Sequence, residues 1–340
     1  MSKFLKYKIH YIYLSLLLIL LIITNLSLGS VIIPIENLLS IITSSETPLY
    51  VRDIVISFRI PKVITAILAG AALSVCGVQM QTLFRNPLAD PYILGISSGA
   101  GLGVAIYVMG VSALGLSIDS SLMSNLGIAS SAWLGAAIIT AIILIVSLKL
   151  KDNISLLIFG IMLASVVGAI ISLIQYLSNA SALKSFVVWT MGSFSGLSYN
   201  QILILAVLMI TGLSISIYNI KDLNTLLMGE VYSKNLGVKL QRTRLRILVA
   251  TTLLAGGVTA FCGPIGFIGI AVPHISRMIF KDSNHKVLIP ASALVGSIIM
   301  VLADTIAQLP GSSGVIPINT VSALIGVPVI FAIILKNKIS

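Results

Sequence analysis

Long apolar runs with almost no charge inside them limit what this chain can fold into more than any other feature. About ten such runs lie between charged residues and Gly or Pro positions, at roughly 11–28, 61–83, 93–111, 126–148, 154–177, 200–218, 247–262, 265–280, 287–309 and 316–335. A helix needs roughly 20 apolar residues to cross the hydrocarbon core of a bilayer. The pattern therefore predicts an all-α polytopic membrane protein with about ten transmembrane helices. Pro264 and Pro273 make the run at 265–280 the one that we expect to be tilted or broken.

The composition excludes the other common classes of protein. Only 9% of the 340 residues are charged, whereas an ordinary soluble domain has about 25%. With 57% hydrophobic residues and a mean hydropathy of +1.10, the chain has too little polar surface for a water-soluble or a disordered protein. The net charge of +11 comes from cations scattered over short loops, which is not the pattern of a nucleic-acid-binding surface. Cys76 and Cys262 lie far apart in apolar runs and have no metal-binding spacing.

The distribution of the cations predicts the orientation. The run at 11–28 follows a short basic segment, but it is longer than the core of a typical signal peptide and no small-residue cleavage site closes it, so we expect a retained first span. If the N-terminus is cytoplasmic, all of the 21 Lys and Arg residues lie on the cytoplasmic side except Arg52, Arg59, Lys62 and Lys184. This bias follows the positive-inside rule. An even number of spans then places the C-terminus in the cytoplasm as well.

Small residues recur every four positions in two of the runs. Ala66, Gly70 and Ser74 share one face of the second predicted helix, and Gly99 and Gly103 share one face of the third. Small residues in membrane helices allow the backbones to approach closely. The spacing therefore predicts a tight bundle.

The chain lacks the motifs of an enzyme. It has no G-x-x-x-x-G-K-[ST] phosphate loop and no H-E-x-x-H motif, and its carboxylates do not cluster. Its three histidines, His10, His274 and His285, are scattered along the sequence. We therefore expect no catalytic residue, no metal site and no cofactor in this chain, and a pathway through the membrane is the remaining role.

The segment Arg85-Asn86-Pro87-Leu88-Ala89-Asp90-Pro91 interrupts the apolar sequence between the second and third runs. Its two prolines remove backbone donors and keep the residue before each of them out of helical geometry. Such a break at the membrane face is either a plain turn or a non-helical gate that lines a cavity.

The longest predicted cytoplasmic loop runs from about 219 to 246. Asp222 can cap a short helix that Gly229 ends, and Gly237 can end a second one. Two short helices outside the membrane fit the docking of a partner. The alternative is a basic anchor on anionic headgroups, a role that also fits the arginines at 242, 244 and 246.

A few polar residues lie within or beside the predicted spans. Ser165, Gly168, Ser172 and Gln175 share one face of the fifth helix, which fits either an aqueous path or close packing. Asp304 is the only acid well inside a span, and it could carry protons, line the pathway or stay neutral in a hydrogen bond to Ser or Thr. Its place near the outer end of the span favours a structural role.

Arg59 and Lys62 flank Pro61 at the outer end of the second span. Long cations at such a position extend toward the lipid headgroups. They can equally form a positive patch for an acidic partner on the outer surface.

Several of these stretches together resemble the FecCD family of permease subunits, which import iron–siderophore complexes, haem and cobalamin. The matches run in order from residue 59 to residue 290 and comprise Arg59-Ile60-Pro61-Lys62, Ala69 to Ser74 with Gly77 and Gln79, Arg85 to Pro91, Leu94 to Ala100, Leu227-Met228-Gly229-Glu230 with Leu236-Gly237, Gly263 to Gly269, Pro273 to Arg277, and Leu288-Ile289-Pro290. Each match is short, but their common order makes the resemblance specific.

The resemblance implies a single permease domain over residues 1–340, similar to type II ABC importers, with ten spans and both termini cytoplasmic. It implies a second permease copy, identical or homologous, around a central pathway. Two ATPase subunits would bind inside and hold the ATP and Mg²⁺, and a periplasmic or lipid-anchored substrate-binding protein would dock outside.

The resemblance also implies roles for individual residues. Those that match the ATPase-coupling helices at about 219–240 are Leu226, Met228, Gly229, Glu230, Leu236 and Gly237. Those that match the gate or pathway are Asn86, Pro87, Leu88, Ala89, Ser165, Gly168 and Ser172. Arg59 and Lys62 match positions that meet acidic residues of the binding protein. Pro273, His274, Arg277 and Asp304 match positions with a structural role.

Two positions depart from the family pattern. The ninth span commonly carries Asp and, four residues later, Arg, whereas here Asp304 is followed by Gln308, so one docking cation is missing. The tenth span usually begins Pro-x-Gly, whereas this chain has Pro317-Ile318-Asn319. Because Asn tolerates turn geometry, we expect the fold to persist and the nearby pathway lining to differ.

We therefore predict the permease subunit of an ATP-driven importer in the inner (cytoplasmic) membrane, with an iron–siderophore as cargo. Haem and cobalamin are alternative cargoes for the same architecture. A proton-coupled secondary transporter that uses Asp304 is a remote alternative from another class.

Overall fold

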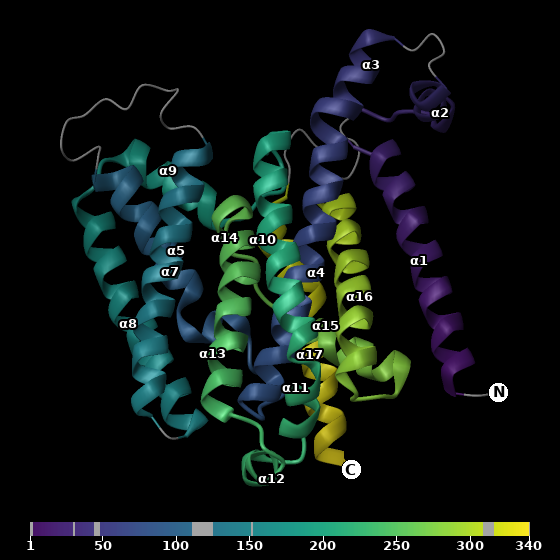
Figure 1. Ribbon diagram of the computed structural model, residues 1–340. Helices are drawn as coiled ribbons and strands as arrows, with labels where there is room; N and C mark the ends of the chain where they lie inside the picture. Colours follow the sequence, from purple (N-terminus) through teal and green to yellow (C-terminus); the bar gives the residue numbers. More distant parts are fainter. Residues whose placement is uncertain are drawn as a thin grey trace.

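The computed structural model describes residues 3–29, 31–43, 48–110, 125–150, 152–308 and 316–339. These residues form helices and the turns between them, and no strand occurs among them (Figure 1). Residues 111 and 309, at the ends of two predicted runs, and Lys151, one of the predicted cytoplasmic cations, lie outside the described residues.

Within these ranges, seven helices are long and apolar enough to cross a membrane. Five of them are α1 (Lys3–Ser27), α7 (Asn125–Lys149), α8 (Asn153–Leu177), α10 (Tyr199–Tyr218) and α16 (His285–Ala307). The sixth joins α3 (Leu49–Asp53), a π-helical turn η1 (Ile54–Arg59) and α4 (Ile60–Leu83) into one continuous helix. The seventh joins α13 (Leu240–Thr251), a π-helical turn η4 (Thr252–Gly256) and α14 (Gly257–Cys262).

Three further apolar helices are shorter. They are α5 (Ile96–Ala105) with the π-helical turn η3 (Ile106–Gly110), α15 (Ile268–Phe280), and the apolar part of α17 (Ile318–Ile339). The run at 265–280 is not one continuous helix, as its prolines predicted. Phe267 has a φ of 71°, and helix α15 begins at the next residue. Each of the ten predicted runs thus corresponds to a helix, and the count of ten transmembrane spans stays a prediction.

Short helices lie at both ends of the bundle. Helices α11 (Ile220–Leu226) and α12 (Glu230–Asn235) confirm the two short helices expected in the loop at 219–246. At the opposite end lie α2 (Ile35–Thr43) and α9 (Ala180–Thr190), neither of which the apolar runs predicted (Figure 1). Helix α1 begins, and α17 ends, at the end of the bundle that carries α11 and α12 (Figure 1).

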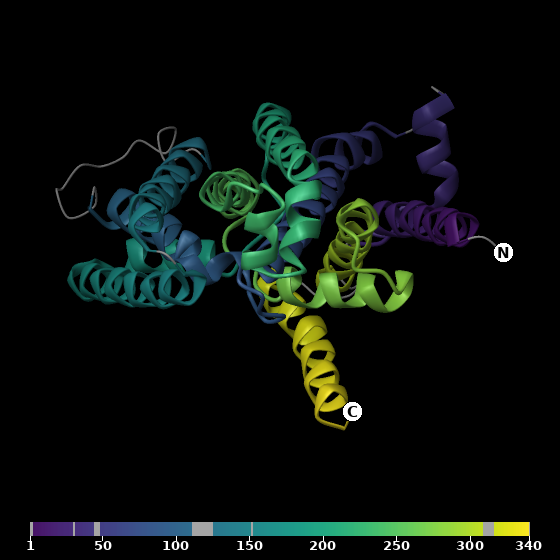
Figure 2. The same ribbon diagram turned by 60° about the horizontal axis from the view of Figure 1, so that its bottom comes forward.

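Helix α4 lies in the middle of the bundle, between α10 and α16, with α1 on the far side of α16 (Figures 1 and 2). Its glycines allow this position. A Cβ built on Gly70 would overlap the carbonyl group of Gly296 in α16, and one on Gly77 would overlap that of Gly269 in α15. Gly99 and Gly103 of α5 meet the backbone of α7 in the same way. The close packing predicted from the small residues is therefore confirmed.

Candidate functional site

The segment from α11 to Gly237, hereafter the α11–α12 segment (residues 220–237), protrudes from one end of the bundle (Figure 1). Gly229 and Gly237 have φ values of 109° and 85°, which glycine adopts without strain. Gly229 separates α11 from α12, and Gly237 follows α12. Helix α11 buries Leu223 and Leu226 against the bundle. The turn and α12 instead expose apolar side chains, namely Leu227, Met228, Val231, Tyr232 and Leu236, with Met228 67% and Val231 78% exposed.

An exposed apolar cluster outside the membrane is typical of a protein interaction site. Of the residues expected to couple to an ATPase, Met228 and Leu236 lie in this exposed cluster. Leu226 is buried and holds α11 on the bundle.

Glu230, at the start of α12, is bonded to the bundle. Its Oε1 accepts a hydrogen bond from Nδ2 of Asn153, the first residue of α8. The same amide nitrogen donates to the carbonyl oxygen of Leu83 at 2.7 Å. Asn153 therefore joins α12 to the last turn of α4.

A second set of bonds joins α11 to the same turn. Asn224 Oδ1 accepts from the backbone nitrogen of His285 at 2.8 Å and also lies 2.8 Å from Nδ1 of the His285 ring. The other ring nitrogen, Nε2, lies 2.9 Å from the hydroxyl oxygen of Thr82 in α4. His285 is fully buried at the start of α16.

Asp222 does not cap α11 as the sequence predicted. The residue before α11 is Asn219, and it makes no side-chain capping bond. Asp222 instead accepts a hydrogen bond from Thr243 of α13 at 2.6 Å and pairs with Arg246 at 3.5 Å. Arg244, expected in a basic anchor, is buried and donates to the carbonyl oxygen of Leu150 at 3.1 Å.

The non-helical break after α4 is an ordered turn. Arg85 has a φ of 49°, and Asn86 closes the turn because its Oδ1 accepts from the backbone nitrogen of Leu88 at 2.9 Å. Asp90 ends the turn and caps a 3₁₀ helix, η2 (Pro91–Leu94), by accepting from the backbone nitrogen of Tyr92 at 2.8 Å. Burial raises the pKa of Asp90 to about 6, although the bond from Tyr92 acts in the opposite direction.

The motif Pro273-His274-Ile275-Ser276-Arg277 contacts this turn from α15. His274 Nε2 lies 2.9 Å from the carbonyl oxygen of Pro87. Arg277 Nη1 donates to Oε1 of Gln81 in α4 at 2.8 Å, while Gln81 Nε2 donates to the carbonyl oxygens of Gly269 and Ile270 at 3.3 Å. The turn at 86–89 is thus held against α15, and the sequence alone did not indicate this contact.

The face of α8 that carries Ser165, Gly168 and Ser172 is open among the residues that the structure describes. Ser165 and Ser172 are exposed, and their hydroxyl groups donate only to carbonyl oxygens of their own helix, at 2.9 and 3.0 Å. A Cβ built on Gly168 would meet nothing within 4 Å. The face is available to a pathway or to another chain.

The charged groups of Arg59 and Lys62 bind partners inside the bundle. Both residues are buried, and the Arg59 guanidinium donates to the carbonyl oxygens of Leu26 and Val31. Lys62 Nζ forms an ion pair with Oδ1 of Asp304 at 3.1 Å. Neither cation presents an exposed charge in this conformation, and their docking to a binding protein stays a prediction.

Asp304 joins three helices. Its Oδ2 accepts from Asn25 of α1 at 3.0 Å and from Gln308 at 2.7 Å, while Lys62 reaches it from α4. The partners are therefore a cation and two amides rather than the Ser or Thr considered from the sequence. Gln308, at the position where the family commonly has Arg, serves as one of these partners.

Asn319, the second departure, also makes a defined contact. Its Oδ1 accepts from the backbone nitrogen of Gly266 at 3.1 Å. Its backbone nitrogen donates to the carbonyl oxygen of Met191 at 3.2 Å. Asn319 therefore fixes the start of α17 against the break that precedes α15.

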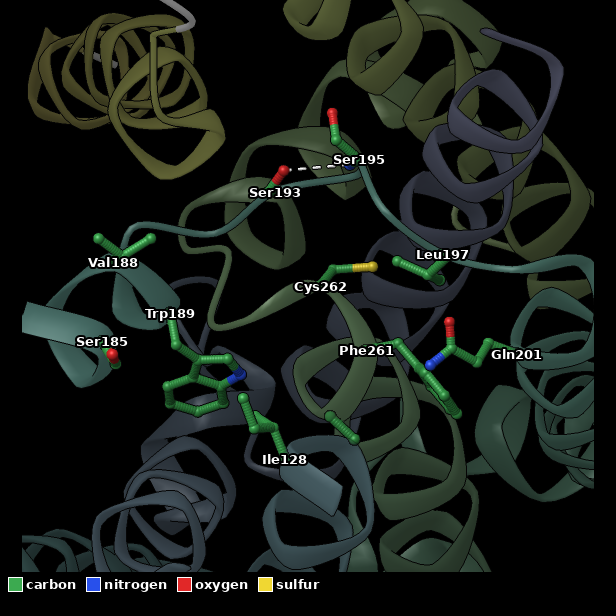
Figure 3. Close-up of a pocket in the computed structure, with 11 residues that line it drawn as sticks. Ile128, Ser185, Val188, Trp189, Ser193, Ser195, Leu197, Gln201, Phe261 and Cys262 are labelled. Atoms are coloured by element: carbon green, nitrogen blue, oxygen red, sulfur yellow. Dashed lines mark hydrogen bonds between the residues drawn. The ribbon is translucent and has the colours of Figure 1, made fainter. Parts of the chain in front are cut away.

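A pocket of about 220 Å³ lies between α7, α9, α10 and α14, and no residue predicted from the sequence lines it. Figure 3 shows Trp189, Phe261, Cys262 and Gln201 around it, with the backbone nitrogen of Ser195 bonded to Ser193 Oγ at 3.0 Å. Ligand sites in proteins typically have about 300 to 1,000 Å³. We therefore do not assign this pocket to a cargo. Among the described residues, no group of three or more His, Cys, Asp or Glu side chains could hold a metal ion.

Comparison with known proteins gives consistent relatives. Residues 17–336 match the FecCD transport family. The chain is 32% identical over 330 residues to the hemin transport system permease protein HmuU of Yersinia pestis, over 96% of this chain and 95% of that protein. It is 35% identical over 283 residues to the vitamin B12 import system permease protein BtuC of Citrobacter koseri, over 82% of each.

A solved structure of a metal-chelate type ABC transporter in an inward-facing conformation has the same fold. The TM-score is 0.82 at 29% sequence identity, and the match covers 97% of this chain and 99% of that one. Together with the apolar helices, these similarities identify a multi-pass permease subunit of an ABC transporter rather than a catalytic enzyme. The chain belongs to the FecCD transport family.

Proposed function

We propose that this protein is the permease subunit of an ATP-driven importer that carries an iron chelate across the inner membrane. The chelate that we propose as cargo is an iron–siderophore. The single observation that carries the proposal is the α11–α12 segment, which protrudes from the bundle (Figure 1). It exposes apolar side chains that need a partner to cover them. The sequence contains no phosphate loop, so the nucleotide is bound by separate ATPase subunits that dock on this segment.

The arrangement of the remaining chains follows the type II ABC importers. A second permease copy faces Ser165, Gly168 and Ser172 of α8 across the pathway. This is supported by the exposure of the two serines and by the open space at Gly168 among the described residues. A substrate-binding protein delivers the cargo at the end that carries α2 and α9. Both termini and the α11–α12 segment are cytoplasmic, in accord with the positive-inside rule.

Haem and cobalamin remain supported as cargoes by a specific observation. The relatives are named for hemin and vitamin B12 transport and match over most of the chain at 32% and 35% identity. No described residue of the bundle distinguishes these cargoes from a siderophore complex.

Uptake of a panel of labelled cargoes tests the proposal. Cells with and without the gene are given ferric siderophores, haem and cobalamin, and the ATP dependence of uptake is measured. We expect gene-dependent uptake of one or more ferric siderophores. Gene-dependent uptake of haem or cobalamin alone would show that this compound, and not a siderophore, is the cargo. Uptake driven by a proton gradient without ATP would contradict the assignment as an ATP-driven importer.

The contact with the ATPase is tested by removing the side chains of Glu230 and Leu236 together. We expect the double alanine variant to lose uptake while ATP hydrolysis by the complex continues, because the coupling contact is lost. Lys221→Ala in α11 is the control. Unchanged uptake in the double variant, with normal recovery of the ATPase, would count against the assignment of this segment.

A further inference from the structure

The α11–α12 segment is bonded twice to the last turn of α4, through two unrelated sets of side chains. From α12, Glu230 reaches the carbonyl oxygen of Leu83 through the amide of Asn153. From α11, Asn224 reaches the hydroxyl group of Thr82 through the ring of His285. The two connections therefore end on neighbouring residues of α4, although they start on different helices and pass through α8 and α16 respectively.

The direction of the hydrogen bonds through His285 follows from the backbone. Because Asn224 Oδ1 accepts from the backbone nitrogen of His285, this oxygen must also face the ring. Nδ1 then donates to Asn224, and Nε2 lies 2.9 Å from the Thr82 hydroxyl oxygen, which is also 2.9 Å from the carbonyl oxygen of Val78 in the preceding turn of α4. His285 is fully buried, so water does not replace either bond, and the position of α11 is passed to α4 through a rigid ring.

The last turn of α4 leads directly into the turn at 86–89. The carbonyl oxygen of Thr82 accepts from the backbone nitrogen of Arg85 at 3.3 Å, and that of Gln81 accepts from Asn86 at 3.2 Å. On its other side, the turn is held by His274 of α15 through the carbonyl oxygen of Pro87. The last turn of α4 is also bonded directly to α15, since Gln81 accepts from Arg277 and donates to the carbonyl oxygens of Gly269 and Ile270. A displacement of this turn relative to α15 must therefore strain these bonds and deform the turn at 86–89.

The segment also has contacts that do not lead to this turn. Asp222 of α11 bonds to Thr243 and Arg246 of α13, the next helix in the chain. Asp152, beside Asn153, accepts from the backbone nitrogen of Ser155 at 2.7 Å and so caps α8. These neighbouring bonds provide controls for the two connections.

We propose that Asn153, Asn224 and His285 are positioning residues that transmit movement of the α11–α12 segment to the turn at 86–89. The inference rests on the proposed function, because an ATPase has to move the segment. The transmission needs a shift of the last turn of α4, which also strains the bonds of Gln81 to α15.

The test follows the exposure of the turn in the complete complex. Leu88, which is 38% exposed, is replaced by Cys as a labelling site, since the native Cys76 and Cys262 are buried. The rate of maleimide labelling is measured in the purified complex with its ATPase subunits, without nucleotide and with ATP plus vanadate. The nucleotide-dependent change in this rate reports movement of the turn.

We expect Asn153→Ala and Asn224→Ala each to reduce this change at least about threefold, because each variant removes two bonds and the loss of even one has an effect of this size. The rate without nucleotide and the recovery of the ATPase stay as in the parent complex. Asp152→Ala and Thr243→Val, which remove the neighbouring bonds, retain the full change. Combining Glu230→Ala with Asn153→Ala gives no further reduction, because both act on one connection.

A full nucleotide-dependent change in both Asn153→Ala and Asn224→Ala overturns the inference, as does an equal loss in the two controls. If Asn153→Ala does not assemble, Asn153→Ser, which keeps a small polar residue next to the N-cap Asp152, carries the same expectation. A parent complex that binds no ATPase, or that shows no change with nucleotide, overturns the proposed function itself and the inference with it.

Discussion

Lys62 and Asp304 form an ion pair inside the bundle, where either charge without its partner would lower the stability of the fold. Taking two charges out of water costs several kcal/mol per ion, and their attraction offsets this only with good geometry and further hydrogen bonds. Asp304 has such bonds from Asn25 and Gln308, and its side chain is fully buried. At the scale of single residues, this cluster joins the start of α4 to the ends of α1 and α16.

Removal of one partner of this pair has a predictable effect on stability. We expect Lys62→Met to destabilise the fold by about 3 to 5 kcal/mol, because Asp304 is left as an unpaired buried charge. Thermal unfolding of the purified protein in detergent measures the loss. The double variant Lys62→Met with Asp304→Asn should recover a large part of it, and equal unfolding temperatures for the parent and Lys62→Met would contradict the role of the pair.

Asp90 gives a second prediction for a single residue, on the dependence of stability on pH. Its pKa is about 6 in the fold against 3.8 for the free side chain, so the folded state binds a proton more tightly than the unfolded one. Stability is therefore lost as the pH rises from about 4 to about 6. We expect Asp90→Asn, which keeps an acceptor for Tyr92, to remove this loss.

The advantage of Asp90→Asn over the parent protein should be near zero at pH 4 and on the order of 3 kcal/mol at pH 7. Unfolding temperatures of the two proteins across this range measure it. A constant difference between them would show that Asp90 does not titrate in this window.

At the scale of helices, the backbone of α4 is in contact with two neighbours at once. Gly70 faces Gly296 of α16, and Gly77 faces Gly269 of α15, with no space for a Cβ at either crossing. Because lipid gives helices no hydrophobic reason to associate, close contact of this kind supplies the attraction between them. The position of α4 also determines where its last turn meets the α11–α12 segment.

Gly77→Ala tests this packing. The added methyl group would overlap a backbone oxygen, which cannot rotate away, so we expect a loss of about 3 kcal/mol or more. Gly168→Ala in α8 is the matched control, since its Cβ meets nothing within 4 Å, and it should raise stability by about 0.4 to 1 kcal/mol. Thermal unfolding and the yield in the membrane fraction measure both variants, and similar behaviour of the two would contradict the packing argument.

At the scale of the whole molecule, both termini and the α11–α12 segment share one end of the bundle, while α2 and α9 share the other (Figure 1). The cations of the sequence divide in the same way, with Lys184 of α9 at the end that has few of them. The positive-inside rule predicts that a bundle with this asymmetry inserts with its basic end in the cytoplasm.

Labelling from one side of the membrane tests this orientation. Lys184 and Val231 are both exposed and lie at opposite ends of the bundle. With an impermeant maleimide on intact cells, we expect Lys184→Cys to react fully and Val231→Cys to react about tenfold less until the cells are permeabilised. The reverse result would invert the topology and remove the basis for an ATPase on the α11–α12 segment.

Several features of the fold and site were open to prediction because they depend on local sequence. Apolar length located ten helices, proline and glycine indicated the turn at 86–89 and the ends of α11 and α12, and small residues at intervals of four indicated close packing. The ordered set of short motifs indicated the FecCD family. Helices α2 and α9 were missed because they are short and lie outside the long apolar runs.

Contacts between polar side chains were decided by the tertiary structure alone. Asn25 and Asp304 are 279 positions apart, and Thr82 and His285 are 203 positions apart, so neither pair leaves a pattern in the sequence. Their meeting depends on how α4 crosses α16 and how α1 lies against it. The sequence by itself therefore determined the membrane class, the family and the set of helices, because hydropathy and motifs are local. The tertiary structure decided which buried charges pair and which residues join the α11–α12 segment to α4, because those contacts exist only once the helices have packed.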